Sequence, residues 1–224
     1  MPFMFVCALA TISSPLLNPN TIPTEKGFIS LFDGKTTKGW HGYKRNDMPK
    51  AWKVVNGTLN LTPGDDGGDI SSDAIFSNFE LRLDWKISKG GNSGIMYRAD
   101  EGHAAAYMTG PEMQVLDDKE HPDGRKPVTS AGSCYGLYAC SKKTVKPAGH
   151  WNSVRIIVNG RHVEHWLNGS RVVSYDLQSD DWNKRVAESK FSQMPDYGTL
   201  SIGHIVLQDH GNQVSYRNIR IKRL

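Results

Sequence analysis

The stretch of sequence that decides the fold covers residues 156–175 and reads IIVNGRHVEHWLNGSRVVSY. Two Asn-Gly pairs, at 159–160 and 168–169, separate three short runs rich in β-branched and aromatic residues. Asn-Gly accepts the positive φ angles of a two-residue type I′ turn, which joins neighbouring antiparallel strands. The stretch therefore predicts a tight meander of three strands.

The rest of the chain carries the same kind of pattern. Asn56-Gly57 separates two further apolar runs, and residues 79–87 alternate strictly between apolar and charged side chains, as in a strand with one buried and one wet face. One helix is expected at residues 179–191, where acidic residues precede basic ones along the helix dipole. Many strands and one short helix predict an all-β fold, a two-sheet antiparallel β-sandwich of the jelly-roll type. Further strands are expected at residues 93–98, 112–116, 199–207 and 214–222.

Composition narrows the function classes. The 224 residues include 38% hydrophobic and 22% charged side chains, which is typical of a soluble globular protein. The net charge is +4, but the basic residues are scattered and form no patch of the kind that binds nucleic acid. We expect one domain at residues 27–224 and no nucleic-acid partner.

The N-terminal residues 1–14 are the most apolar stretch and resemble the apolar region of a signal peptide without its basic leader. They are too short to span a membrane, so no integral membrane segment is expected. Residues 15–26, with three prolines, are expected to form a linker. We therefore predict an exported protein, periplasmic or extracellular, and the alternative is a loosely docked terminus.

The two cysteines of the domain, Cys134 and Cys140, lie six residues apart. On one extended strand that separation is about 20 Å, well beyond the reach of a disulfide. We expect free thiols.

The segment from Pro111 to Asp118 is the strongest candidate for a site. On a strand, Glu112 and Gln114 share one face, while Met113 and Val115 point into a core. A bulge after Val115 would also turn Asp117 toward the outer face. Two carboxylates on a concave face suit the cleavage of glycosidic bonds, and the alternative is an ordinary solvated strand face.

Three other patterns offer polar groups. Glycines precede a strand that ends at Arg98, whose planar guanidinium suits an oxyanion, although a surface arginine at a turn is the simpler interpretation. Three polar residues end an apolar strand and suit sugar hydroxyls, proton transfer or a metal, or merely form a corner: Gln208, Asp209 and His210. His165 shares a face with apolar neighbours, which is more typical of a core histidine than of a catalyst. The acidic, glycine-rich residues 65–69 lack the spacing of a calcium loop.

Several separated segments, taken in order, resemble the 3-keto-disaccharide hydrolase family, which is common in exported Bacteroidetes proteins. The resemblance covers roughly residues 27–224 and implies a concanavalin A-like lectin/glucanase jelly roll acting on glycosides whose C3 hydroxyl has been oxidised to a ketone. The matching segments are Leu31-Phe32-Asp33-Gly34-Lys35, Gly39-Trp40, Asn78-Phe79-Glu80-Leu81, Gly91-Asn92-Ser93-Gly94-Ile95, Tyr97-Arg98, Glu112-Met113-Gln114-Val115-Leu116-Asp117, Trp151-Asn152, Val163-Glu164-His165-Trp166-Leu167-Asn168-Gly169, Leu207-Gln208-Asp209-His210-Gly211 and Arg217-Asn218-Ile219.

A C3 ketone makes the C2 proton acidic, so a base can remove it and the group on C1 can then leave; addition of water completes net hydrolysis. We expect either His165 or His210 to be the base, Arg98 with Gln114 to stabilise the oxyanion, and Glu112 or Asp117 to serve the leaving group. A divalent metal held by Asp209 or His210 is the alternative to the arginine. Carbohydrate contacts are expected from Gln114, Asn92, Gln208, Tyr138 and Trp85.

Two rival functions remain open at this point. Laminarinase-type glucanases of this fold carry Glu-x-Asp-x-x-Glu, and this chain has Glu112, Gln114 and Asp117 at the matching positions. The amide and the shorter acid argue against a conventional retaining glucanase. A non-catalytic carbohydrate-binding module is the other rival, and a groove lined by tryptophans instead of carboxylates would favour it.

Overall fold

The computed structural model describes residues 25–64 and 66–224. The expected signal peptide and nearly all of the expected linker lie outside these residues, so export of the protein stays a prediction. In the part of the chain that the structure describes, no helix combines the length and the apolar character needed to cross a membrane.

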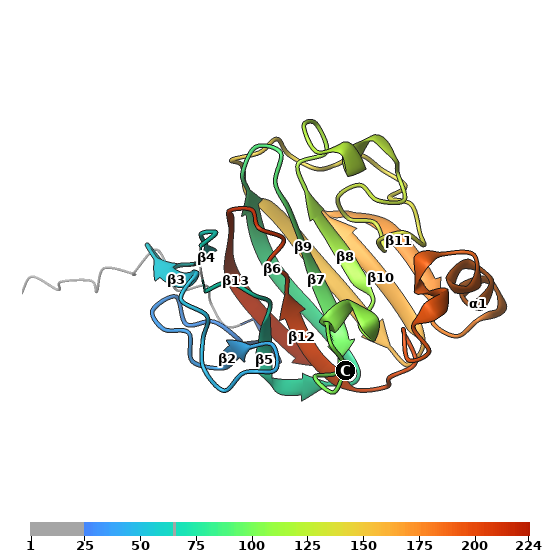
Figure 1. The fold of residues 1–224 in the computed structure, drawn as a ribbon, viewed down its shortest axis with the longest axis horizontal. Helices are drawn as coiled ribbons and strands as arrows, with labels where there is room; N and C mark the ends of the chain where they lie inside the picture. Colours follow the sequence, from blue (N-terminus) through green and yellow to red (C-terminus); the bar gives the residue numbers. More distant parts are fainter. Residues whose placement is uncertain (1–24, 65) are drawn as a thin grey trace, which may run out of the picture.

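Two antiparallel sheets are packed face to face (Figure 1). The larger sheet has the order β11-β10-β9-β6-β13-β4-β3, with β1 also paired to β13, and the smaller has the order β2-β5-β12-β7-β8. The predicted two-sheet sandwich is confirmed. The strands are β1 Ile29–Ser30, β2 Trp40–Gly42, β3 Trp52–Val55, β4 Thr58–Leu61, β5 Ile70–Phe76, β6 Phe79–Ile87, β7 Asn92–Ala99, β8 Glu112–Leu116, β9 Asn152–Asn159, β10 His162–Leu167, β11 Ser170–Asp176, β12 Gly203–Leu207 and β13 Val214–Arg223.

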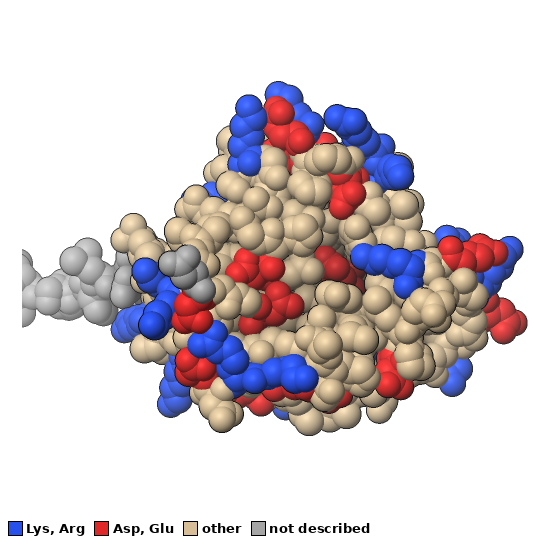
Figure 2. Space-filling model, in the orientation of Figure 1, with Lys and Arg blue, Asp and Glu red and all other residues tan. Residues whose placement is uncertain are grey.

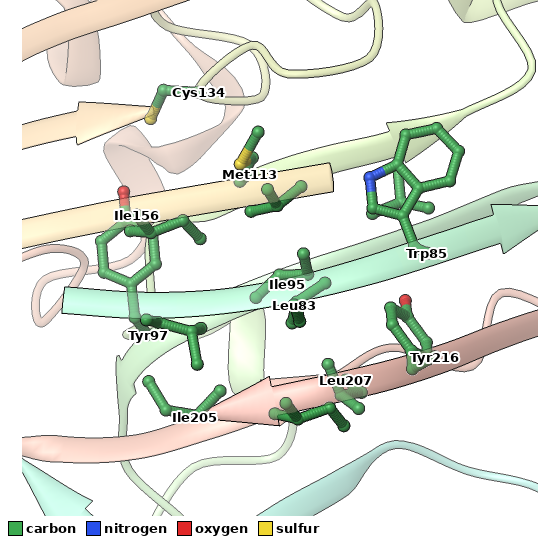
Figure 3. Close-up of a cluster of buried hydrophobic side chains, with 14 of the residues drawn as sticks. Leu83, Trp85, Ile95, Tyr97, Met113, Cys134, Ile156, Ile205, Leu207 and Tyr216 are labelled. Carbon is green, nitrogen blue, oxygen red and sulfur yellow. The ribbon is translucent and has the colours of Figure 1, made fainter. Parts of the chain in front are cut away.

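The core lies between the sheets and follows from strand alternation. Along β6 the apolar residues Leu81, Leu83 and Trp85 are buried, while the charged residues between them are partly exposed. They face side chains of the smaller sheet such as Ile95 and Met113 (Figure 3). Since each strand of the smaller sheet buries one side in this core, its alternate residues face outward.

The turns confirm two of the three Asn-Gly predictions. Asn56 and Gly57 both have positive φ angles, 51° and 75°, and so do Asn168 and Gly169, at 49° and 82°. The prediction at Asn159 is wrong, because Asn159 still pairs with His162 and the turn consists of Gly160 and Arg161. Only Gly160 of this pair has a positive φ, which suits a type II′ turn.

The helical segment begins where expected but is shorter. Ser179 caps α1 (Asp180–Ala187) by accepting a hydrogen bond from the Trp182 N–H, and the chain then enters the 3₁₀ turn η3 (Lys190–Gln193). The helix docks through a stack of rings made of Tyr138, Tyr175, Trp182, Tyr197 and Phe191. Strand β12 also begins later than predicted, at Gly203, because residues 199–202 form turns and bends. Cys134 and Cys140 are free, as expected.

Candidate functional site

The outer face of the smaller sheet carries a row of polar positions that runs across its strands. Ile70, Leu207 and Ile95 pair with one another in register and are all buried in the core. Their chain neighbours therefore lie on the outer face, where the Gln208 N–H donates to the Gly94 carbonyl (3.0 Å). Gly94 in turn pairs with Gln114. The resulting row consists, in order across the smaller sheet, of Asp69, Gln208, Gly94 and Gln114.

Glu112 is the central group of this face. Its side chain is only 7% exposed, and burial raises the pKa of its carboxyl group to about 8. The positive charge of Lys190 opposes this rise, and the negative charges of Asp69 and Asp123 add to it. With its amide nitrogen turned toward them, Gln114 donates to Glu112 Oε1 (2.9 Å) and to the Ser93 carbonyl (3.1 Å). Oε2 of Glu112 is therefore the oxygen left to carry and transfer a proton.

Gly94 makes room for this carboxyl group. A methyl group on its Cα would lie 2.1 Å from Glu112 Oε1 and 2.6 Å from its carboxyl carbon. Only glycine lets the Glu112 side chain lie over β7 at this position.

A neighbouring part of the same face is covered by the chain itself. The 3₁₀ turn η1 (Ala106–Met108) buries Ala106 against Met96 and Val206, next to Tyr43. The Tyr43 hydroxyl donates to the carbonyl of Asp100 (2.6 Å) and lies 3.0 Å from that of His103, which holds this cover in place. The cover therefore lies over Met96, the residue of β7 that pairs with Glu112.

A second carboxyl group, that of Asp69, lies on the same face. Asp69 Oδ1 accepts a hydrogen bond from the Asp209 N–H (2.9 Å), while Asp209 itself accepts from the N–H groups of Gly68 and Gly211 (both 2.8 Å). Burial and the nearby Asp209 charge raise the pKa of Asp69 to about 6. Figure 2 shows acidic side chains gathered in the hollowed middle of this face.

Of the predicted polar groups, the structure brings together Glu112, Gln114, Gln208 and Asn92. Gln208 Oε1 is buried and has no hydrogen-bond partner within residues 25–64 and 66–224, so it is free to receive a ligand hydroxyl. Asn92 stands two residues before Gly94 on the same face of β7 and is 3% exposed.

His165 does not join this group: its interpretation as a core histidine is confirmed, and the expectation that it is the base is contradicted. It belongs to the larger sheet, on the side of β10 that faces the core, and has no exposed surface. Its Nδ1–H donates to the Gly132 carbonyl (3.1 Å), and its Nε2 accepts from the Tyr97 hydroxyl (2.9 Å). Burial lowers its pKa to about 4, so the ring is a weak base whose nitrogens are both engaged.

Replacing His165 by alanine should therefore affect the fold more than the chemistry. We expect a loss of about 2–4 kcal/mol in the free energy of unfolding, because the variant leaves a cavity and loses the hydrogen bonds to Gly132 and Tyr97. Urea denaturation measures this loss, with the half-exposed His162→Ala on the same strand as control. Unchanged stability together with lost turnover would return the base role to His165.

Arg98 and Asp117 are engaged elsewhere. Arg98 has a φ of 51° at a break in the pairing of β7 with β12, and its guanidinium donates to the Ser77 carbonyl (2.9 and 2.7 Å) rather than into the groove. β8 pairs with β7 without a register shift, so there is no bulge after Val115 that would turn Asp117 into the groove. The Asp117 carboxylate accepts from the N–H groups of Gly90 (2.8 Å) and Lys119 (3.2 Å), which orders the loop before β7.

The predicted aromatic contacts also lie away from the groove. Trp85 is fully buried in the core, and Tyr138 is stacked in the ring series at α1, where its hydroxyl donates to Asp181 (2.8 Å). Trp166 of β10 packs against the Arg155 guanidinium, and Trp151, just before β9, packs against that of Arg217. Both tryptophans therefore belong to the larger sheet or its edge. A groove lined by carboxyl and amide groups instead of tryptophans favours an enzyme over a binding module.

The expected metal ligands do not form a site. His210 is exposed in the loop after β12, and Asp209 is bonded to backbone N–H groups. Among the described residues, no three His, Cys, Asp or Glu side chains converge closely enough to hold a metal ion.

This chain is similar to a known protein family and to several known proteins. Residues 27–222 match the family model of the 3-keto-alpha-glucoside-1,2-lyase-like domain. A 3-keto-disaccharide hydrolase of Bacteroides thetaiotaomicron is 36% identical over 88% of this chain and 79% of its own length. The crystal structure of a candidate glycosyl hydrolase from Parabacteroides distasonis superposes with a TM-score of 0.82, at 35% identity over 89% of this chain and 94% of that one. The β-glucanase of Bacillus licheniformis, at 10% identity, covers 88% of this chain and 97% of its own with a TM-score of 0.52, which shows the shared fold alone.

Proposed function

This chain belongs to the 3-keto-alpha-glucoside-1,2-lyase-like family, and we propose from that premise that it cleaves glycosides whose C3 carries a ketone. It is an enzyme of the glycosyl hydrolase type. The curated relative is named for 3-keto-disaccharides, and the groove on the smaller sheet offers the polar groups that such a sugar needs. The substrate proposed here is a disaccharide with an oxidised ring.

The observation that carries the proposal is the buried carboxyl group of Glu112. With a pKa raised to about 8, it holds its proton at neutral pH, whereas an exposed glutamate would be ionised. A protonated carboxylic acid in a groove is what the departing glycosidic oxygen needs. Glu112 is therefore the general acid that protonates the leaving group.

The amides beside it suit the oxidised ring. Elimination across C1 and C2 places negative charge on the C3 oxygen after the C2 proton leaves, and hydrogen-bond donors at that oxygen lower the barrier. Gln208, whose Oε1 is unpartnered within the described residues, and Asn92 flank the floor at Gly94. The NH2 groups of these two amides are the donors for the ketone oxygen, while Gln208 Oε1 accepts from a neighbouring sugar hydroxyl.

A retaining glucanase mechanism fits this groove less well. It needs two carboxyl groups about 5–5.5 Å apart, one as acid and one as nucleophile. The second acid of the strand, Asp117, is held by two backbone N–H groups. The oxidised substrate removes the need for a nucleophile, because its C2 proton is acidic enough for elimination.

Incubation with matched substrates tests the proposal. We expect the protein to cleave a 3-keto disaccharide and to leave the unoxidised parent disaccharide intact, with release of the two sugars followed by mass spectrometry or NMR. Equal cleavage of both would point to a conventional glycosidase. Tight binding of either sugar without cleavage would instead indicate a binding module.

A further inference from the structure

Asp69 enters the groove from a segment far from β8 in the sequence. Its carbonyl accepts a hydrogen bond from the Tyr43 N–H (2.8 Å), which extends the pairing of β2 with β5 by one position. Its carboxylate is oriented by the Asp209 N–H, which bonds to Oδ1 (2.9 Å). Within the described residues this leaves Oδ2 to receive a proton from a ligand.

The sheet register places Asp69 across the groove from Glu112. Asp69 extends β5 and Gly94 lies on β7, with β12 between them, so their backbones are about 10 Å apart. The Glu112 carboxyl group reaches over Gly94 and so shortens the gap between the two acids. Gln208 stands on the floor between them. This spacing accommodates one sugar ring with an acid on each side.

We propose that Asp69 is the catalytic base that removes the C2 proton, while Glu112 acts as the acid on the opposite side of the ring. The inference rests on the proposed function and replaces the histidines with a carboxylate. His165 is sealed in the core, and His210 is exposed on the loop that follows β12.

The charges around the two acids suit these roles. Asp69 is faced by Asp209 from the loop after β12, by Tyr43 from the segment after β2, and by Glu112 from β8. Glu112 is faced by Lys190 of η3 and by Asp123 as well. With pKa values of about 6 and about 8, Asp69 is ionised and Glu112 protonated at pH 7. Two carboxyl groups with separated pKa values are the usual arrangement of an acid–base pair.

The reaction balances with these two groups alone. Asp69 takes the proton from C2, and the electrons of the C2–H bond move to the C3 oxygen as an enolate. The enolate collapses to reform the ketone, the C1–C2 double bond forms, and the bond from C1 to the leaving oxygen breaks. That oxygen takes the Glu112 proton. Water then adds: Glu112 accepts its proton, hydroxide joins C1, and Asp69 returns a proton to C2, which restores both groups.

Hydrogen exchange at C2 separates the two roles. In D₂O, with a 3-keto disaccharide, we expect Asp69→Asn to slow deuterium entry at C2 by at least about 100-fold. Glu112→Gln should keep exchange within about tenfold of wild type while cleavage is lost. The matched control is Asp176→Asn, an exposed aspartate of β11 on the other sheet.

Chemical rescue distinguishes the loss of a catalytic base from structural damage caused by the substitution. In Asp69→Ser, added formate should restore C2 exchange, because a small carboxylate can occupy the vacated position. Exchange at the wild-type rate in Asp69→Asn would overturn the assignment, and so would a loss in Asp69→Ser that formate does not restore. If wild-type protein neither exchanges nor cleaves the keto sugar, the proposed function itself fails, which is a separate result.

The pH dependence of kcat/KM is a second test of the roles of Asp69 and Glu112. Wild-type kcat/KM should rise as Asp69 ionises near pH 6 and fall as Glu112 ionises near pH 8. The residual activity of Asp69→Asn should lack the acidic limb and keep the alkaline one. An unchanged acidic limb in that variant would contradict the role of Asp69.

Discussion

Replacing Glu112 by glutamine should lower kcat/KM for a 3-keto disaccharide by about 100- to 10,000-fold. Glutamine has nearly the same shape and can still hydrogen-bond with Gln114, so the groove should remain intact. What it lacks is the proton that the leaving oxygen takes from Oε2. Steady-state kinetics with the purified variant measure the loss, and the exposed Glu120→Gln serves as control.

The leaving group makes this prediction specific to an acid. In a 3-keto glucoside of a nitrophenol, the leaving group is nitrophenolate. This anion is stabilised by its ring, so its departure needs no proton donor. The Glu112→Gln variant should therefore cleave this aryl substrate within about tenfold of the wild-type rate. A variant equally slow on both substrates would show that Glu112 acts before bond cleavage rather than on the leaving oxygen. Full activity on the disaccharide would remove Glu112 from the mechanism.

Gly94→Ala should give the second large loss, at least about tenfold in kcat and up to the full effect of removing the acid. The added methyl group would lie 2.1 Å from Glu112 Oε1, so the carboxyl group must move out of its position over β7. Gly94 is not among the glycines with positive φ, so alanine fits its backbone. The fold should therefore survive, as circular dichroism and thermal unfolding can verify.

Gly64→Ala is the matched control for this change, because its new methyl group would meet nothing closer than 3.9 Å. We expect Gly64→Ala to keep wild-type activity. If Gly94→Ala were also fully active, the position of Glu112 over β7 would not matter for the reaction. A rise in KM with unchanged kcat in Gly94→Ala would likewise show that Glu112 contributes to substrate binding rather than to proton transfer.

The sequence predicts the local part of this site well. Alternation on β8 assigns Met113 and Val115 to the core and Glu112 and Gln114 to the groove, because side chains of a strand point to opposite faces in turn. The same rule places His165 with Val163 and Leu167 on the buried side of β10. Alternation does not reveal which sheet a strand joins, so only the structure excludes His165 from the groove, because β10 belongs to the larger sheet.

The non-local part of the site needs the structure. Asp69 belongs to the acidic, glycine-rich segment 65–69, which lacks the spacing of a calcium loop and carries no catalytic motif either. It reaches the groove only because β5 pairs with β12, which brings Asp69 beside Asp209, 140 residues later in the chain. Nothing in the spacing of either segment specifies that pairing. The role of Asp117 is likewise not predictable from alternation, because loop residues supply the backbone N–H groups of Gly90 and Lys119 that bind its carboxylate.

The two buried carboxyl groups also tie the folding equilibrium to proton uptake. The pKa of Glu112 rises from 4.5 to about 8 and that of Asp69 from 3.8 to about 6, so the folded chain keeps protons that the unfolded chain has released. The stability linked to each group is fully present below its unfolded pKa and is lost as pH rises through its folded pKa. Unfolding near neutral pH therefore expels a proton from the groove, and alkaline solution favours that expulsion. The groove that holds an acid ready for chemistry is thus the part of the fold through which alkali destabilises the whole protein.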